Sequence, residues 1–346
     1  MSPLDVEHLR LGTRASRLAT TQSGFVARRL TELLEHPVEL VHVRTQGDAD
    51  RTTSLSALGG TGVFVAALRE ALLESRCDVA VHSLKDLPTT QPAELAFVTP
   101  EREDPRDALC ARDGLTVETL PRGGRVGTGS PRRAAQLQAA RPDLEIVDIR
   151  GNVETRLARA LGEDADLDAV VLAFAGLSRL GRTEVVSEVL DPAVVAPAPG
   201  QGALAVEARS ADLADGGPLA EAFAALDHRP TRLAVTAERA VLARLEAGCA
   251  APIGAYARLE DGELVMSAVV GRVDGAEQLT HTARVAVGPD LADAAADTEA
   301  RELGVRVAER LLADGAARLA PLTAAAPPAP REPQRGPTGT DDPEVP

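Results

Sequence analysis

Apolar runs of strand length alternate with helical patterns through the first 200 residues. This alternation is typical of an α/β architecture, and we expect its sheets to be mostly parallel. The runs that we predict as strands are HLRLGT (8–13), VELVHVRT (38–45), DVAVHSL (78–84), ELAFVTP (94–100), DALCA (107–111), RVGTG (125–129), LEIVDIRG (144–151) and DAVVLAFAG (168–176).

Two segments interrupt the alternation. The stretch EREDPRD, residues 101–107, is charged, contains proline and has few apolar residues, so it is typical of a crossing between domains. The second interruption is VVAPAPGQGALAVEA, residues 194–208. Its tail has the pattern of a strand, which we expect to return to the first domain and make that domain discontinuous.

A different pattern begins near residue 226. A helical run, LAVTAERAVLARLEAG, precedes two strand-like runs that are joined at Asp261 and Gly262, a hairpin signal. This predicts a small α+β third domain. The proline-rich end of the chain has little to bury, and we expect it to be disordered. The predicted domains are residues 8–101 with 200–222, residues 102–199, residues 226–320 and a tail of residues 321–346.

Composition excludes several classes of protein. The chain has 346 residues, 44% of them apolar, which is enough for more than one core. Its net charge of −15 argues against nucleic acid as the main partner. No run approaches the roughly 18 apolar residues that cross a bilayer, and the first residues lack the features of a secretory signal. We therefore expect a cytoplasmic protein with no membrane partner. We also expect a monomer.

The three cysteines are too few for a disulfide framework, and none has a metal-ligand spacing with the six histidines. We therefore expect no metal. Cys77 and Cys110 adjoin or occupy apolar strands and are most simply small buried hydrophobes. Cys249 instead follows a glycine after a helical run, where a loop would leave its thiol accessible.

Lys85 is the one lysine among 37 basic side chains, and Asp86 follows it directly. A Lys–Asp pair after an apolar run is also typical of an ordinary solvated loop. The nearby His82 alternates within a strand, which favours a structural role. Residues 45–62 have the composition of a flexible lid. The glycine-rich LGGTGVF at 58–64 lacks the lysine of a phosphate loop, so a nucleotide site is not expected.

Arginines recur where predicted strands lead into helices. An arginine in the first helical turn opposes the helix dipole at a cost of about 0.3 to 1 kcal/mol, so its recurrence suggests a bound anion. Arginine matches carboxylate with two parallel hydrogen bonds, so several carboxylates are the expected ligand. The alternative is that each arginine pairs with a nearby Asp or Glu. The residues concerned are Arg14 with Ser16, Ser130 with Pro131, Arg132 and Arg133, and Arg150 with Asn152 and Arg156.

The motifs VHSLKD, GTGSPRR, RGNVETR, LAFAGLSRLG, PGQGA, TAERA and LEAGCAAPIGAY follow one another in this order. With them the chain, from about residue 8 to 318, resembles the porphobilinogen deaminase family. The resemblance implies two lobes like those of periplasmic binding proteins and a smaller third domain. It also implies a transferase of haem biosynthesis. Such an enzyme joins four porphobilinogen molecules head to tail, with loss of ammonia, on a covalent dipyrromethane primer, and its product is hydroxymethylbilane.

The resemblance also assigns roles to residues. Asp86 matches the catalytic aspartate, whose carboxylate stabilises the cationic intermediate left by ammonia loss. Adjacent side chains of an extended segment point to opposite sides, so Lys85 is expected to face cofactor carboxylates. We expect Arg132 and Arg156 to lie in a solvent-filled cleft. The implied cofactor-binding residues are Cys249, which carries the thioether, with Lys85, Ser83, Ser130, Arg132, Arg133 and Arg150. The implied substrate-binding residues are Arg14, Ser16, Arg156, Arg179 and Gln201.

The chain departs from the family pattern at Thr61, where lysine is frequent, at Gly129 and Pro131 in GTGSPRR, and at Ala247. Two other classes of function stay open. One is a noncatalytic anion-binding protein with the same two lobes. The other makes Lys85 a Schiff-base nucleophile, because a lone lysine beside a carboxylate suits that chemistry.

Overall fold

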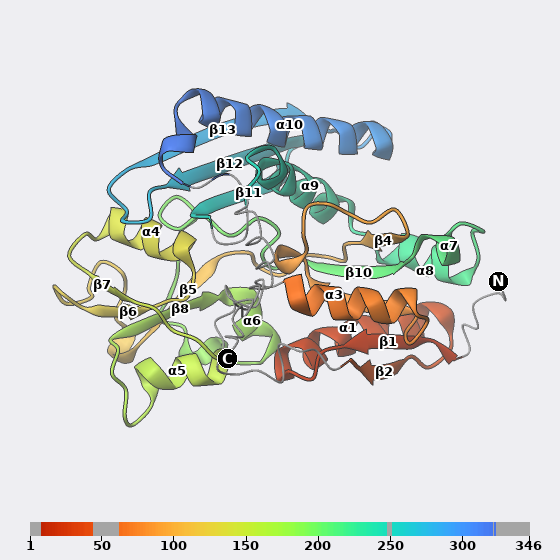
Figure 1. Ribbon diagram of the computed structural model, residues 1–346, viewed down its shortest axis with the longest axis horizontal. Helices are drawn as coiled ribbons and strands as arrows, with labels where there is room; N and C mark the ends of the chain where they lie inside the picture. Colours follow the sequence, from red (N-terminus) through yellow and green to blue (C-terminus); the bar gives the residue numbers. More distant parts are fainter. Residues whose placement is uncertain (1–7, 44–61, 248–250, 321, 323–346) are drawn as a thin grey trace, which may run out of the picture.

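The computed structural model describes residues 8–43, 62–247, 251–320 and 322. In these ranges two five-stranded sheets form two α/β lobes, and a three-stranded sheet with two helices forms a third body. The third body lies across both lobes (Figure 1). These sheets confirm the predicted fold class, whereas the predicted domain boundaries stay a prediction.

The first lobe has the strand order β2-β1-β3-β10-β4. Helices α1 and α8 pack on one face of this sheet, and α3 packs on the other. The elements are β1 (Arg10–Thr13), α1 (Arg17–Leu34), β2 (Glu39–His42), α3 (Gly62–Leu73), β3 (Val79–Ser83), β4 (Leu95–Val98), β10 (Leu204–Arg209), α7 (Ser210–Leu213) and α8 (Pro218–Leu226).

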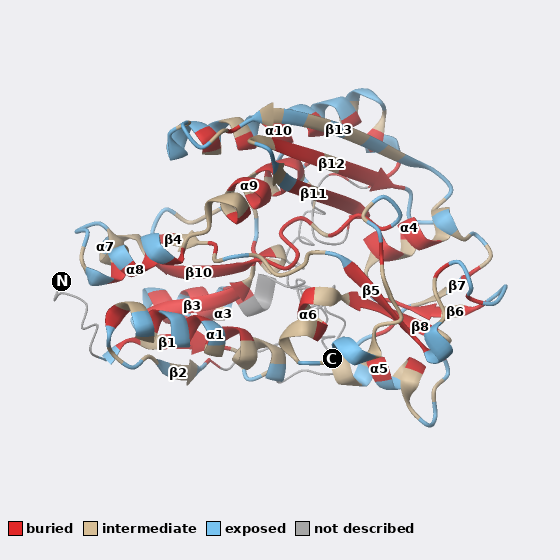
Figure 2. Ribbon diagram, turned by 180° about the vertical axis from the view of Figure 1, so that it is seen from behind, coloured by how far each residue is buried: buried red, intermediate tan, exposed pale blue. Residues whose placement is uncertain are grey.

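The second lobe has the order β7-β6-β8-β5-β9. Successive side chains of a strand point to opposite faces, so Leu109 of β5 packs with Leu137 of α4 while Cys110 packs with Leu157 of α5. Both faces are therefore buried, as the central strands of Figure 2 show. The elements are β5 (Asp107–Ala111), β6 (Arg125–Gly127), α4 (Pro131–Ala140), β7 (Glu145–Val147), α5 (Val153–Leu161), β8 (Ala169–Ala173), α6 (Phe174–Arg179) and β9 (Glu188–Val189).

Two crossing segments, residues 99–106 and 190–203, connect the lobes. They lead into β5 and β10, and each of these strands runs antiparallel to both of its neighbours. The return of the chain through β10 and the crossing near residues 101–107 are confirmed. The prediction of mostly parallel sheets is confirmed for strand direction, because four of the five strands of each lobe run the same way. The strand that enters from the other lobe runs against them.

The third body contains α9 (Arg229–Arg244), β11 (Ile253–Glu260), β12 (Glu263–Gly271), β13 (Gln278–Ala286) and α10 (Asp293–Ala313). The predicted hairpin is confirmed: β11 and β12 pair antiparallel, and Asp261 and Gly262 have φ of 48° and 80°. Both helices pack on the sheet around a core that includes Leu264 and Met266. The sequence did not predict β13, whose alternating face carries polar residues.

Three predicted features lie outside the described residues: the lid apart from Gly62, the thiol of Cys249, and the tail apart from Leu322. Across the described ranges, no helix is long and apolar enough to span a bilayer. The same ranges contain no cluster of His, Cys, Asp and Glu side chains that could hold a metal ion.

Candidate active site

The site begins where β3 ends. Leu84–Asp86 form one turn of 3₁₀ helix, closed by a hydrogen bond from the Leu87 N–H to the Leu84 carbonyl at 3.1 Å. The prediction of an extended segment is therefore wrong at this turn. Adjacent side chains in a 3₁₀ turn are about 120° apart, so Lys85 and Asp86 still diverge. Ser83 at the end of β3 accepts a hydrogen bond from Gln22 at 3.3 Å.

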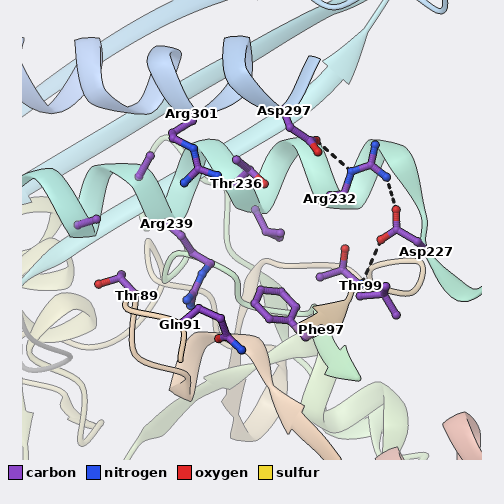
Figure 3. Close-up of a pocket in the computed structure, with 14 residues that line it drawn as sticks. Thr89, Gln91, Phe97, Thr99, Asp227, Arg232, Thr236, Arg239, Asp297 and Arg301 are labelled. Carbon is purple, nitrogen blue, oxygen red and sulfur yellow. Dashed lines mark hydrogen bonds and ion pairs between the residues drawn. The ribbon is translucent and has the colours of Figure 1, made fainter. Parts of the chain in front are cut away.

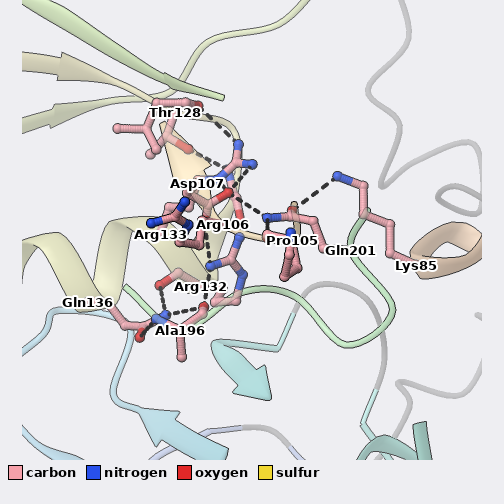
Figure 4. Close-up of polar contacts among 12 residues, drawn as sticks. Lys85, Pro105, Arg106, Asp107, Thr128, Arg132, Arg133, Gln136, Ala196 and Gln201 are labelled. Carbon is pink, nitrogen blue, oxygen red and sulfur yellow. Dashed lines mark hydrogen bonds and ion pairs between the residues drawn. The ribbon is translucent and has the colours of Figure 1, made fainter. Parts of the chain in front are cut away.

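Gln201 connects this turn to the second lobe (Figure 4). Its Oε1 accepts from Lys85 Nζ at 3.3 Å, while its Nε2 donates to the Pro105 carbonyl at 2.7 Å and to Asp107 Oδ1 at 2.8 Å. Gln201 is only 1% exposed. Its amide is thus fully engaged within the protein, and both crossing segments meet at its side chain.

Asp107, the first residue of β5, lies between two arginines of α4. Its carboxylate is 2.7 Å from Arg132 and 2.7 Å from Arg133, and all three side chains are buried. Burial alone would raise the pKa of Asp107, but the two guanidinium groups outweigh burial and hold that pKa well below its ordinary value. The expectation that Arg132 lies in a solvent-filled cleft is wrong, because the start of α4 packs directly on β5.

Three other cations among the predicted site residues have no such acidic partner. Within the described ranges, neither Lys85, Arg156 nor Arg179 forms an ion pair: Arg156 donates to the Gly151 carbonyl at 2.9 Å and Arg179 to the Gly202 carbonyl at 2.6 Å. Burial lowers the pKa of Arg179 and of Arg156, and the charge of Arg133 lowers the latter further.

The pKa of Lys85 is also lowered. Burial is the main reason that this pKa falls to about 8, with Arg133 and Arg132 acting in the same direction and Asp86 and Asp107 opposing them. A shared excess of buried positive charge is what a ligand with several carboxylates would neutralise.

The predicted helix starts are partly confirmed. Ser16 caps α1 by accepting from the Ala19 N–H at 3.3 Å, and Asn152 caps α5 by accepting from the Thr155 N–H at 2.8 Å. Ser130 precedes Pro131 as predicted, but its hydroxyl makes no capping hydrogen bond.

The arginine-bearing helix starts of the two lobes face one another. Arg17 of α1 is 3.5 Å from Glu154 of α5, an ion pair between the first turns of these helices. Arg14 is half-buried just after β1, and Arg150 is exposed, 3.7 Å from Asp148. We call Arg14, Arg150, Arg156, Arg179 and Lys85 together the arginine site.

Sequence reasoning missed Glu238. This fully buried carboxylate accepts from Arg102 at 2.7 and 3.0 Å, from the Gly200 N–H at 2.7 Å and from the Ala257 N–H at 2.9 Å. It therefore ties α9 and β11 of the third body to both crossing segments. The sequence signal for a buried carboxylate here was a glutamate among the apolar positions of a predicted helix.

The remaining candidates have structural roles. His82 lies 3.1 Å from Glu207 in the core, which confirms the structural interpretation. Cys77 and Cys110 are buried free thiols, as predicted. Burial raises the pKa of Cys77 to about 11 and that of Cys110 to about 12, so neither is a ready nucleophile.

Comparison with known proteins decides between the functional classes. Residues 9–214 match the family model described as the porphobilinogen deaminase, dipyromethane cofactor binding domain, and residues 232–313 match the porphobilinogen deaminase C-terminal domain. The chain belongs to the porphobilinogen deaminase family.

Several porphobilinogen deaminases resemble this chain along most of their length. That of Leifsonia xyli subsp. xyli is 56% identical over 316 residues, which cover 91% of this chain and 94% of the relative. That of Cutibacterium acnes is 57% identical over 332 residues, covering 91% and 98%. Among solved structures, the methionine-binding protein MetQ has a TM-score of 0.38 at 15% identity and covers 64% of this chain and 91% of its own. The fold assignment therefore depends on the sheets described above.

The cofactor that names the family model fits the residues present. Dipyrromethane of this family carries several carboxylates, and three cations of the arginine site, Lys85, Arg156 and Arg179, form no ion pair among the described residues. One departure from the porphobilinogen deaminase pattern also has a structural reason. A Cβ on Gly129 would lie 2.5 Å from the Ile149 carbonyl oxygen, so the serine common there in the family would require a shift.

Proposed function

We propose that this chain is a cytoplasmic, monomeric enzyme that condenses four porphobilinogen molecules into hydroxymethylbilane and releases ammonia at each addition. The dipyrromethane primer, held by a thioether to Cys249, would supply the pyrrole carbon to which the first substrate ring is joined. The observation that carries the proposal is the Lys85–Asp86 turn beside cations that have no acidic partner in the described ranges.

Asp86 provides the one carboxylate of the turn. Positive charge develops on the pyrrole ring as ammonia leaves and again as the next ring adds. A fixed carboxylate stabilises that charge and can accept the pyrrole N–H proton. The 3₁₀ turn holds the Asp86 backbone in place through the Leu84 N–H, which donates to the Ala203 carbonyl at 3.0 Å.

The arginine site binds the carboxylates. Porphobilinogen carries an acetate and a propionate, so each addition brings two more negative charges. Arg156 and Arg179 are half-buried and donate only to backbone carbonyls among the described residues, which leaves guanidinium N–H groups for such a ligand.

Gln201 then acts as a positioning residue. Both of its amide hydrogens are used within the protein, so it has no donor left for a substrate carboxylate. Its Oε1 instead accepts from the Lys85 ammonium and so holds it beside the crossing segment.

The test is turnover of porphobilinogen by the purified protein. We expect one hydroxymethylbilane and four molecules of ammonia for every four molecules of porphobilinogen. Asp86→Asn should keep the thermal midpoint and the bound primer but lose turnover by about 100-fold or more, because it removes one preorganised charge. Asp274→Asn, at an exposed turn of the third body, is the matched control and should be fully active.

Absence of ammonia release would support the noncatalytic alternative and overturn the proposal. A covalent adduct on Lys85, trapped with borohydride during turnover, would support the Schiff-base alternative instead.

A further inference from the structure

A second pocket lies between the first lobe and the third body (Figure 3). It has a volume of about 290 Å³ and is lined by β4 and the residues around it, by α9 and by α10. Phe97, Val98, Val235, Ala240 and Ala243 form its apolar lining. None of the residues of the arginine site lines this pocket.

Thr99 brings an unsatisfied hydroxyl to the pocket. The residue is 1% exposed, and its backbone N–H donates to Asp227 at 3.2 Å. Its Oγ1 is buried and has no hydrogen-bond partner among the residues that the structure describes. Buried hydroxyls in native proteins are normally hydrogen-bonded, so a molecule that is not part of the chain is the natural partner.

The other free polar groups of the pocket are also donors or hydroxyls. Thr89, Thr236 and Arg301 line it, and within the described ranges their side chains make no hydrogen bond or ion pair. The acidic residues are already used: Asp297 accepts from Arg232 at 3.0 Å, and Asp227 accepts from the same guanidinium. The free groups therefore favour a ligand that accepts hydrogen bonds and carries negative charge.

The apolar lining narrows the class of ligand. A ring that packs on Phe97 would gain the stabilisation typical of aromatic pairs, whereas a bare inorganic anion would leave that lining without a partner. We propose that this pocket binds a small aromatic carboxylate, with the ring against Phe97 and with Thr99 and Arg301 as the polar groups that hold it. This site goes beyond the proposed function, because it is separate from the arginine site.

The pocket also adjoins the catalytic turn through Arg239. This arginine lines the pocket and donates to the carbonyls of Leu84 at 3.3 Å, Leu87 at 3.0 Å and Pro88 at 2.6 Å. A ligand in the pocket thus contacts a side chain that holds the outer side of the Lys85–Asp86 turn.

The experiment is calorimetric titration of the holoenzyme with benzoate, and separately with inorganic phosphate, in the absence of porphobilinogen. We expect one saturable benzoate site and weaker phosphate binding. Thr99→Val removes the unsatisfied hydroxyl at nearly constant shape, and Arg301→Gln removes the exposed cation. Each should weaken benzoate binding by tenfold or more. Arg306→Gln, one turn further along α10 and outside the pocket, should leave it unchanged.

Three results would overturn the site. These are no benzoate binding, benzoate binding in both pocket variants that is as tight as in the wild type, or phosphate binding as tight as benzoate binding. A loss of benzoate binding in Arg156→Leu would place the ligand in the arginine site instead and would also overturn it. If Thr99→Val does not fold, the benzoate affinity of Arg301→Gln alone tests the site. Because binding is measured without turnover, the outcome is independent of the deaminase activity.

Discussion

Lys85 owes its properties to its immediate neighbours. Its pKa is lowered from 10.5 to about 8 by burial, with Arg133 acting in the same direction. An arginine would keep its charge in this place, whereas a lysine can lose its proton within the working range of an enzyme. The charge of Lys85 therefore depends on what binds beside it.

This dependence predicts an alkaline loss of activity. The ammonium form, which binds carboxylates, is present below the pKa of Lys85 and is lost as the pH rises through it. Bound carboxylates favour the ammonium and raise that pKa, so kcat/KM should begin to fall at or above about pH 8. The pH profile of Lys85→Arg should extend to higher pH, because guanidinium stays charged. Identical alkaline limbs in both proteins would remove Lys85 from carboxylate binding.

The packing of a helix on its neighbouring strand decides whether an arginine in its first turn has an acidic partner. The first turn of α4 packs on β5, which pairs Arg132 and Arg133 with Asp107. The first turn of α5 has no such strand residue beside Arg156, whose described hydrogen bond is to its own loop. Two arginines at similar positions in their helices thus have different roles.

This difference predicts that replacement by leucine affects stability at Arg132 and activity at Arg156. Arg132→Leu leaves the buried Asp107 carboxylate with one counter-charge in place of two and should lower the unfolding free energy by about 3 kcal/mol. Arg156→Leu breaks no ion pair among the described residues, so it should keep the thermal midpoint. Its kcat/KM should fall by about 10- to 100-fold, the usual worth of a charged hydrogen bond. Thermal melts and steady-state kinetics of both variants test this. Full activity of Arg156→Leu would show that Arg156 does not bind substrate.

Local patterns predicted the local elements. The eight strands, the β11–β12 hairpin and the helix starts at Ser16 and Asn152 depend on residues close in sequence, and all are confirmed. The antiparallel direction of β5 and β10 and the pairing of Arg132 with Asp107 depend on contacts between distant segments. No periodicity in a single sequence carries that information.

The whole molecule is held together at Glu238. Its carboxylate joins α9 to Arg102, Gly200 and Ala257, so one buried group fixes the third body to both crossing segments. The two glycines beside Gln201 serve the same junction: Gly202 has a φ of 85°, and a Cβ there would lie 2.4 Å from the Glu103 carbonyl oxygen.

Loss of the Glu238 charge should loosen this junction. Glu238→Gln keeps the shape but leaves Arg102 buried without its counter-charge, which should cost about 3 kcal/mol or more of stability. We expect a lower thermal midpoint and a lower kcat. Glu260→Gln, an exposed glutamate of the same body, should change neither. An unchanged melt for Glu238→Gln would contradict the role given to the junction.

Hydroxymethylbilane is built on a primer that the protein carries covalently, if the proposed function is right. The intact mass of the purified full-length protein therefore shows whether that primer is present. We predict the sequence mass plus one dipyrromethane, with the added mass on the peptide that contains Cys249. The addition should be absent from Cys249→Ser and kept in Cys77→Ser and Cys110→Ser, because those two thiols are buried. An unmodified wild-type mass, or an adduct that persists in Cys249→Ser, would contradict the claim.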